Sequence, residues 1–476
     1  MRRVAAWAVK LLAIGLAVVV LAGTGYAWTN VRNLTTQVTR IDQLGLGPGS
    51  GGSNADGDGT DQNILLVGLD SRDGATPAEL KQLSTGQDGG SMATDTMMVL
   101  HVPADGSKAT VISLPRDSWV SIKGFGKGKL NSAYADGYAD GGGMKGGAKL
   151  LISTVEDLTG LTIDHYVAVS LLAFYRISTA IGGVPVCLKA AQNASTDSDA
   201  YGSGYSGINL PAGPSVIEGK QALAFVRQRH GLPRGDLDRI VRQQYFLSHA
   251  FNKVASAGTL LNPAALNRLI NAVSSSLQVD QGLDLLKLAR QVQDLSAGNI
   301  TFTTLPNTGA QNISYQGQQV SIVGVNFAAI PDFIARLLGQ RTAYDAATTV
   351  KPSTVTVTVA NAVGTAGLAG RNGAALQALG FTVAAPEGAD TTQATTITYP
   401  RGMEAQAKTL AAAVPGAVPI VSGDVTAVTL TLGTDGVQVP GAGGSTLAPS
   451  TAAPPPPSSA APAAPAPSPA LPDCIS

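Results

Sequence analysis

Fixed positive charge gathers in one short segment, ALAFVRQRHGLPRGDLDRIVRQQY, residues 222–245. Only 13% of the chain is charged and its formal net charge is zero. The segment holds Arg227, Arg229, Arg234, Arg239 and Arg242. Arginine guanidinium groups bind phosphate through paired hydrogen bonds. Such a concentration of arginines therefore predicts an anion site, although ordinary surface charge is the alternative for each of them taken alone.

The arginines are placed by two expected elements. ALAFVR reads as a strand, so Arg227 and Arg229, two residues apart, would point to the same face. A helix is expected from Asp236 onward. Its apolar stripe comprises Ile240, Leu247, Phe251 and Val254. At 100° per residue Asp236, Arg239 and Gln243 lie beside that stripe, with Asp236 also a candidate N-cap. Arg242 is expected on the far, solvated side.

A second polar group follows the strand-like run NILLVGL. Asp70 and Arg72 come just after it. Farther on, TDTMMVLHV and ATVISL flank an Asp-Gly turn signal at 105–106. That turn pairs residues so that Asp95 lies opposite Arg116. If the first strand runs parallel to ATVISL, both carboxylates reach the same end of the sheet.

Two carboxylates beside arginines match a pyrophosphate bound with a divalent cation, Mg²⁺ or Mn²⁺. Mg²⁺ uses one or two carboxylates together with substrate phosphates. The glycine-rich segment KGFGKGKLNSAY adds Lys123, Lys127 and Lys129 on an expected loop, and Asp117 more readily orients Arg116 than binds metal. The four histidines are scattered, which gives no zinc pattern, and no GxSxG hydrolase motif is present.

The N-terminus indicates export. Arg2, Arg3 and Lys10 precede an uncharged run from Leu11 to Trp28 that is long enough to span a membrane. The positive-inside rule then leaves the rest of the chain outside the cytoplasm, as a single-pass cell-membrane protein. A signal peptide cleaved after the small residues ending at Ala27 is the alternative.

Composition divides the remainder into an α/β protein of two folded units. A membrane anchor (1–28) and a flexible linker (29–62) precede a large unit, 63–340, in which helices pack on a central mixed sheet. A small α/β unit, 353–434, has no His or Cys and reads as a binding or spacing module. The Pro/Ala/Ser-rich tail, 437–476, is expected to be disordered.

Helices are expected at 142–160, 170–183, 262–280 and 282–295 in the large unit. In the small unit, the alternating run around Val355, Val357 and Val359 predicts a half-buried strand. Two cysteines make no disulfide framework. Cys187 reads as a small buried apolar residue and Cys474 as a free thiol, with a bridge between them left open.

Several of these motifs together resemble the LytR-CpsA-Psr family. They are NILLVGLDSR, TDTMMVLHV, VISLPRDSWV, KLNSAYADGY, AIGGVPV and ALAFVRQRH followed by GDLDRIVRQQ, which occur in the family's order. The small unit resembles the C-terminal LytR-type accessory domain of actinobacterial members. The resemblance implies a membrane-anchored phosphotransferase that moves a glycopolymer from a polyprenyl-pyrophosphate carrier to peptidoglycan.

The resemblance also implies roles for individual residues. Asp70 and Asp95 match the Mg²⁺-associated acids. The pyrophosphate-binding set matches Arg116, Arg227, Arg229, Asp236, Arg239 and Gln243, with Lys129 as a further substrate contact. The family often has an arginine two residues before the second acid, where this chain has Ala93. Either Arg72 supplies the missing charge, or this member of the family binds pyrophosphate less tightly. Leu171, Leu172, Phe174, Tyr175 and Ile177 are candidates for a slot that holds the lipid chain.

Two other functions use the same residues. A polyprenyl-pyrophosphate hydrolase would replace the sugar acceptor with water, and a non-catalytic protein would only bind the wall or the lipid carrier. Export and zero net charge disfavour nucleic acid as a partner.

Overall fold

The computed structural model describes a large part of the 476-residue chain. The described residues are 38–46, 61–70, 76–77, 80, 92–103, 108–199, 202–203, 206–255, 272, 277–284, 300–389, 392, 394–442 and 474–475. Among them no helix combines the length and hydropathy needed to cross a bilayer. The anchor predicted at 1–28 lies outside these residues.

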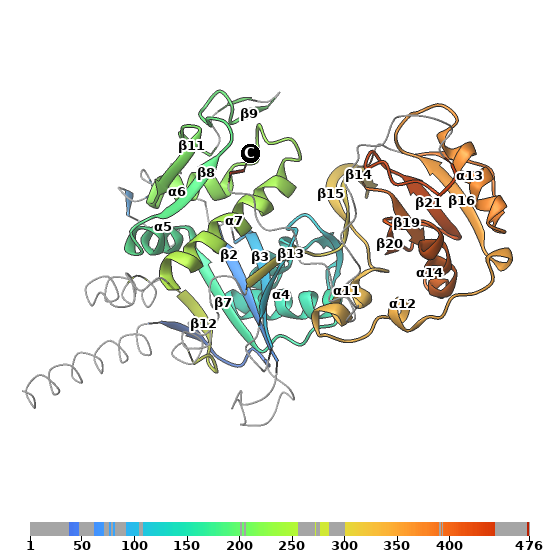
Figure 1. Ribbon diagram of the computed structural model, residues 1–476. Coiled ribbons are helices and arrows are strands. Elements are labelled where there is room, and N and C mark those ends of the chain that lie inside the picture. Colours follow the sequence, from blue (N-terminus) through green and yellow to red (C-terminus); the bar gives the residue numbers. More distant parts are fainter. Residues whose placement is uncertain are drawn as a thin grey trace, which may run out of the picture.

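A seven-stranded sheet forms the centre of the large unit (Figure 1). Its strands are β1 (Thr39–Ile41), β2 (Gln62–Leu69), β3 (Thr94–Val102), β4 (Ala109–Leu114), β7 (His165–Ser170), β12 (Leu277–Asp280) and β13 (Ile300–Thr304). The order across the sheet is β1-β12-β7-β2-β3-β4-β13. β3 is antiparallel to β2 and β4, whereas β2 pairs with β7 in parallel. The predicted mixed sheet is therefore confirmed.

The register of β3 and β4 is the one that the 105–106 turn signal predicts. Met97 pairs with Leu114, and His101 pairs with Thr110. Because β2 and β4 are both antiparallel to β3, they run in the same direction. The residues that follow β2 and β4 therefore emerge at the same end of the sheet as those that precede β3.

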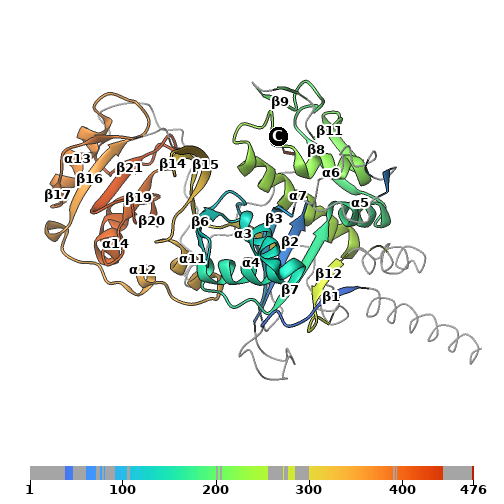
Figure 2. The same cartoon turned by 180° about the vertical axis from the view of Figure 1, so that it is seen from behind.

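Helices cover both faces of the sheet (Figures 1 and 2). The described helices of the large unit are α3 (Ser132–Gly137), the π-helical turn η1 (Tyr138–Gly142), α4 (Gly143–Thr159), α5 (Leu171–Ala180), α6 (Gly219–Arg227), α7 (Asp236–Ala255) and α11 (Ile330–Leu337). Leu65 and Val67 of β2 pack with Val155 of α4 in one apolar core. Ile64 and Met98 belong to a second core on the other face, against which Leu247 of α7 packs. As predicted, α4 ends at Gly160, with φ at 72°.

A third layer lies beyond α7, so that α7 runs between it and the sheet (Figure 1). It contains α5, α6 and the strand pairs β8 (Val184–Leu188) with β11 (Gly213–Ile217) and β9 (Ser198–Asp199) with β10 (Gly202–Ser203). Phe225 of α6 and Tyr245 and Phe246 of α7 share its core. This burial of α7 on two sides decides the environment of the arginine-rich segment.

Two secondary-structure predictions are wrong. Residues 222–227 form the end of α6 rather than a strand. Every residue from Ala222 to Val226 is buried, and a short continuous apolar run does not distinguish strand from helix by its period. Residues 277–280, expected to end a helix, form β12. The rest of the helix expected at 262–280, apart from residue 272, lies outside the described residues, as does all but the start of that expected at 282–295.

The sequence ends of the large unit also differ from expectation. β1 lies inside the expected linker and pairs with β12, while Ile41 and Leu44 join the core. Within the expected disordered tail, Ile475 is 4% exposed and forms a bridge with Leu188. Cys474 forms a disulfide with Cys187. The interpretations of Cys474 as a free thiol and of Cys187 as a simple buried apolar residue are therefore wrong. The bridge joins residues 287 apart in sequence, which no local pattern reveals.

Two hairpins extend from the large unit. β5 (Trp119–Ile122) pairs with β6 (Gly126–Lys129), so the expected lysine loop is a short ribbon. β14 (Asn307–Tyr315) pairs with β15 (Gln318–Val325), and Val323 donates its N–H to the carbonyl of Asp117 at 2.8 Å. The second ribbon therefore starts beside the segment that follows β4.

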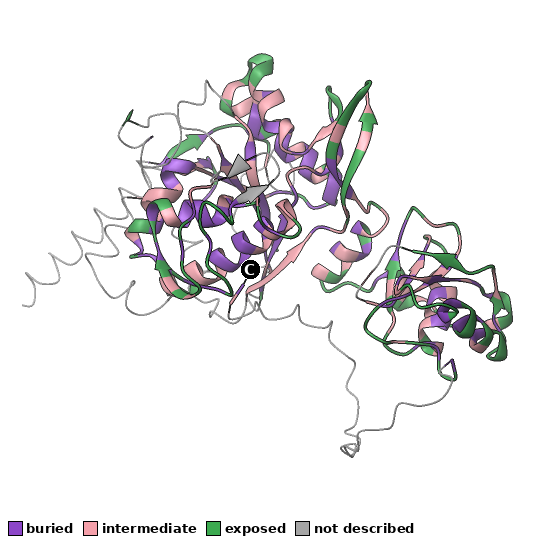
Figure 3. Cartoon of the chain, turned by 90° about the horizontal axis from the view of Figure 1, so that it is seen from above, coloured by how far each residue is buried: buried purple, intermediate pink, exposed green. Residues whose placement is uncertain are grey.

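The small unit has its own sheet and core (Figure 3). Its elements are β16 (Thr356–Asn361), α13 (Leu368–Ala378), β17 (Thr382–Val383), β18 (Glu387–Gly388), β19 (Thr396–Tyr399), α14 (Glu404–Ala413), β20 (Val418–Val421) and β21 (Val428–Leu432), preceded by α12 (Ala343–Ala346) and the 3₁₀ turn η2 (Pro352–Thr354). Val355, Val357 and Val359 are fully buried, as the alternation predicted. Arg401 donates to the carbonyl of Ala328 at 2.7 Å, which joins the small unit to the large one.

Candidate functional site

Arg116 is the centre of a charged cluster at the end of the sheet. It follows β4, and its Nη1 lies 2.5 Å from Oδ1 of Asp95, the second residue of β3. Its Nε lies 3.4 Å from Asp236 and 3.6 Å from Asp117. The predicted hairpin register thus brings Asp95 and Arg116 together. Asp236 comes 141 residues after Asp95 and 120 residues after Arg116 in the sequence, so only the fold brings it beside them.

The start of α7 contributes a second arginine. Nη2 of Arg239 lies 2.9 Å from Asp236 and donates to the carbonyl of Asp95 at 3.3 Å. Gln243, one turn later, donates through Nε2 to the Thr96 hydroxyl at 2.9 Å and to the carbonyl of Val226 at 3.2 Å. The predicted grouping of Asp236, Arg239 and Gln243 beside the apolar stripe is present, and it docks α7 onto β3.

Arg227 and Arg229 do not share a strand face. Arg227 is the last residue of α6 and lines the pocket described below, and its charge acts on Asp95. Arg229 is exposed, and its Nε lies 3.2 Å from Nε2 of His230. Because a helix end replaces the expected strand, Arg227 lies within the site and Arg229 lies at its periphery.

The other predicted residues occupy different places. Asp70 follows β2, and its N–H donates to the carbonyl of Ala93 at 3.0 Å, so it lies at the sheet end where Asp95 begins β3. Nζ of Lys129 lies 3.0 Å from Asp117 and so reaches the cluster through that carboxylate. Arg72 lies outside the described residues.

The arginines of the cluster favour the ionised form of Asp95. Burial would raise the pKa of Asp95, but the positive charges of Arg116, Arg239 and Arg227, together with the hydrogen bond from Arg116, hold it below its ordinary value. Burial would lower the pKa of Arg116, yet Asp236, Asp95 and Asp117 raise it. For Arg239, burial prevails and lowers the pKa. The lining of the pocket described below includes two arginines, Arg227 and Arg239, and one carboxylate, Asp95, so its net charge is positive and suits an anion.

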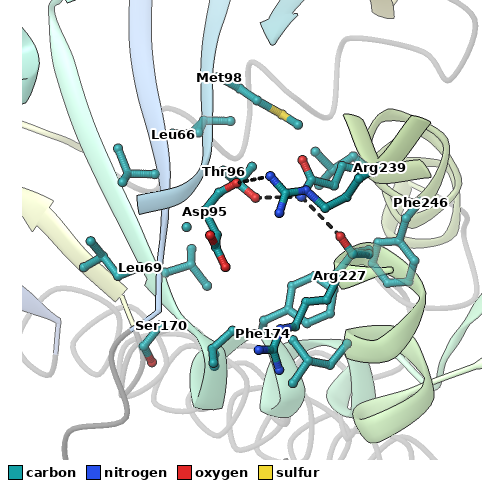
Figure 4. A pocket seen from close by; sticks show the side chains of 18 of the residues that line it. Leu66, Leu69, Asp95, Thr96, Met98, Ser170, Phe174, Arg227, Arg239 and Phe246 are labelled. Atoms are coloured by element: carbon teal, nitrogen blue, oxygen red, sulfur yellow. Dashed lines mark hydrogen bonds between the residues drawn. The ribbon is translucent and has the colours of Figure 1, made fainter. Parts of the chain in front are cut away.

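An apolar cavity of about 200 Å³ opens from this charged end (Figure 4). It lies between β2, β3 and β7 on one side and α5, α6 and α7 on the other. Its lining consists of Leu66, Val67, Gly68, Leu69, Asp95, Thr96, Met98, Val167, Val169, Ser170, Leu171, Phe174, Leu223, Val226, Arg227, Arg239, Gln243, Phe246 and Leu247. Arg227 and Arg239 both line it, and Arg239 contacts the backbone of Asp95 there (Figure 4). One site thus combines charged groups with an apolar slot.

The slot differs in part from the prediction. Leu171 and Phe174 line it, whereas Leu172 and Tyr175 pack in a small cluster with Leu223, and Ile177 is outside the lining. Most of the lining comes from β2, β3 and α7, whose apolar residues read in sequence as ordinary core. Only the packing of three helices against one sheet face leaves space among them.

The described residues include no group of three or more His, Cys, Asp or Glu side chains that could hold a metal by itself. Asp70 and Asp95 lie at adjacent strand ends, and Asp95 is already paired with Arg116. This donor set fits a Mg²⁺ ion that takes most of its ligands from phosphates and water, and does not fit an all-protein cage.

The environment predicted for Arg242 is wrong. Its side chain is 1% exposed, and its Nη1 donates to Oε1 of Gln228 at 2.5 Å. The helical wheel assumed one buried face, but α7 is covered on both sides. Gln228, which is fully buried, was also missed, because an isolated glutamine between two arginines carries no sequence signal.

The family model LytR_cpsA_psr matches residues 39–328, and the model described as LytR cell envelope-related transcriptional attenuator matches residues 354–435. The fold and the cluster define an α/β protein with a cluster of arginines and carboxylates at the mouth of an apolar pocket. The chain belongs to the LytR-CpsA-Psr family, as the motifs predicted.

Two relatives are similar over much of the chain. The cell wall biosynthesis protein LcpA of Corynebacterium glutamicum is 40% identical over 374 residues, which cover 72% of this chain and 69% of that protein. The polyisoprenyl-teichoic acid–peptidoglycan teichoic acid transferase TagU of Oceanobacillus iheyensis is 32% identical over 247 residues, which cover 52% of this chain and 67% of that protein. A LytR-Csp2A-Psr enzyme from Actinomyces oris, of known structure, is 20% identical with a TM-score of 0.44, over 64% of this chain and 96% of that one.

Proposed function

We propose that this protein transfers a glycopolymer from a polyprenyl-pyrophosphate carrier to peptidoglycan, outside the cytoplasmic membrane to which residues 1–28 anchor it. The observation that carries the proposal is the position of the Asp95–Arg116–Asp236–Arg239 cluster at the mouth of the apolar cavity. A lipid pyrophosphate has the same two parts, a charged head and an apolar chain. TagU, similar over half of this chain, is named for such a transfer to peptidoglycan.

The proposed reaction breaks one phosphoanhydride bond. A sugar hydroxyl of the acceptor attacks the phosphorus that carries the glycan, and the lipid monophosphate leaves with the electron pair of the bridging P–O bond. The hydroxyl proton passes to solvent or a basic oxygen nearby. Charge that develops on the bridging and terminal oxygens is stabilised by Arg116, Arg227 and Arg239, and this electrostatic contribution usually dominates such transfers.

The arginines serve different atoms of the substrate in this proposal. Arg227, at the end of α6, and Arg239, on α7, line the cavity together with Asp95 and would hold the pyrophosphate between them. Arg116 is held by three carboxylates and so keeps a fixed orientation. Asp70 and Asp95 would hold Mg²⁺, which when bound would neutralise phosphate charge.

The decisive experiment uses a synthetic lipid-pyrophosphate glycan, Mg²⁺ and peptidoglycan oligomers, with mass spectrometry of the products. Oligomers that gain the glycan phosphate are the expected result. Glycan phosphate released into water would instead make the protein a hydrolase, and an unchanged lipid would make it a binding protein. Topology is tested separately: a reporter that works only in the cytoplasm, fused after residue 60, should be inactive.

A further inference from the structure

Two consecutive residues of α7 hold the chain on both sides of Arg227. Gln243 donates to the carbonyl of Val226 at 3.2 Å, and Arg242 donates to the side chain of Gln228 at 2.5 Å. Val226 and Gln228 are the direct neighbours of Arg227. The end of α6 is therefore tied to α7 at the point where Arg227 enters the pocket.

Gln228 has its side-chain donors and acceptor engaged. Its Oε1 accepts from Arg242, while its Nε2 donates to Oε1 of Gln192 at 2.9 Å and to the carbonyl of His230 at 3.2 Å. Its backbone N–H donates to the carbonyl of Ala224 at 3.0 Å as α6 ends. A glutamine fully removed from solvent and bonded in this way fixes the path of the chain as it leaves the helix.

Burial of the Arg242 guanidinium in this position is unfavourable in free energy. Its guanidinium carbon lies 5.1 Å from the centre of the Phe225 ring. Burial lowers its pKa to about 10, against the opposing effect of Asp197 and Asp238, so it stays charged at neutral pH. A charge is retained in an interior only with compensating partners, and an apolar side chain would pack there at lower cost.

We propose that Arg242 is a positioning residue: through Gln228 it fixes the end of α6 so that Arg227 lines the cavity together with Asp95. The proposal rests on the proposed function in that Arg227 binds the pyrophosphate. Terminal helix turns fray readily, and Arg227 is the last residue of α6. A displacement of about 1 Å in a group that contacts the reacting atoms can reduce the rate about 10²-fold.

The test compares Arg242→Met, Arg242→Lys and the control Arg234→Met in the full chain reconstituted in nanodiscs. Arg234 lies in the same segment, but its side chain is 64% exposed and pairs with Asp238. Arg242→Met should lower kcat about 10²-fold, as misplacement of a contact group does. Lys can still donate one hydrogen bond to Gln228 and should restore part of the loss, while Arg234→Met should keep wild-type turnover.

Epistasis with Arg227 separates positioning from a general structural defect. In an Arg227→Ala background, Arg242→Met should cause no further loss of turnover, or of inorganic pyrophosphate affinity where turnover is below detection. The same proportional loss in both backgrounds would overturn the proposal. So would an Arg242→Lys protein no better than Arg242→Met.

Hydrogen exchange tests the geometry without any turnover. Arg242→Met should speed amide exchange in residues 227–231 and leave β2 and β3 as in the wild type, because the hydrogen bond to Gln228 is lost at the end of α6. Unchanged exchange at 227–231 would refute the positioning role even if the wild-type protein proved inactive toward lipid pyrophosphates. Inactivity of the wild-type protein toward lipid pyrophosphates would refute the proposed function. The role of the Arg242–Gln228 contact would still be decided by the hydrogen-exchange result.

Discussion

Arg116 bridges Asp95 of β3 and Asp236 of α7, with N–O distances of 2.5 and 3.4 Å. The bridge joins a strand to a helix whose sequence lies more than a hundred residues away. Each partner is only partly exposed, at 15% for Arg116, 24% for Asp95 and 16% for Asp236. This guanidinium therefore helps to set the relative position of the sheet end and α7, together with the contacts of Arg239 and Gln243 with β3.

Arg116→Met should reduce turnover of a lipid-pyrophosphate glycan by about 10² or more, the usual effect of removing one charge-stabilising donor. It also leaves Asp95 and Asp236 without their shared cation. Steady-state kinetics with circular dichroism to establish folding measures the change. Arg371→Met, on an exposed position of α13, serves as the matched control. Equal turnover in the two variants would exclude Arg116 from the site.

Acid stability should depend on Asp95. Because the folded-state pKa of Asp95 lies below its ordinary value of 3.8, its ionised form stabilises the fold fully above that value. The contribution is lost as the pH falls below 3.8 and through the folded-state pKa. Urea unfolding in that range should show a steeper loss of unfolding free energy for the wild type than for Asp95→Asn. The control is Asp157→Asn, at an exposed position of α4, which should lose unfolding free energy with falling pH as steeply as the wild type. An equally steep loss in Asp95→Asn would contradict the prediction.

Tight metal binding should require phosphate. Asp70 and Asp95 supply two carboxylates at most, which favours an ion shared with the ligand. Isothermal titration should detect weak Mg²⁺ binding to the protein alone and tighter pyrophosphate binding when Mg²⁺ is present. Asp70→Asn and Asp95→Asn should each reduce the increase in pyrophosphate affinity that Mg²⁺ produces. Tight Mg²⁺ binding without pyrophosphate would show that other residues hold the ion.

The apolar cavity should select for a lipid chain. Each buried methylene contributes about 0.8 kcal/mol, so prenyl pyrophosphates should compete more strongly than inorganic pyrophosphate. Leu247→Trp narrows the cavity and should weaken competition by farnesyl pyrophosphate while leaving inorganic pyrophosphate unaffected. Leu379→Trp, at a site 45% exposed in the small unit, is the control. If Leu247→Trp weakened the binding of both ligands equally, the cavity would not be the place where the lipid chain binds.

The Cys187–Cys474 bridge should stabilise the protein without entering the chemistry. It ties the end of the chain to β8, beside the buried Ile475. Loss of such a bridge typically costs about 2–5 kcal/mol. Cys474→Ser should therefore unfold at lower urea concentration than the wild type, and dithiothreitol should destabilise only the wild type. Equal sensitivity of the two proteins to dithiothreitol would point to another cause.

The sequence by itself determined what depends on neighbours along the chain. The Asp-Gly turn signal predicted the β3–β4 register, because short turns dictate strand pairing, and so it predicted the contact of Asp95 with Arg116. Gly160 marked the end of α4, and alternation of Val355, Val357 and Val359 marked β16. The motif order identified the family.

Only the tertiary structure decided the conformation and the surroundings of elements that are buried between two layers. Residues 222–226 are apolar throughout, so their period does not distinguish helix from strand, and the burial of α6 by its neighbours selects a helix. Arg242 faces solvent on an isolated amphipathic helix, but the third layer covers that side of α7 and gives it Gln228 as a partner. Cys187 meets Cys474 across 287 residues for the same reason: contacts between distant segments depend on packing, which no local period encodes.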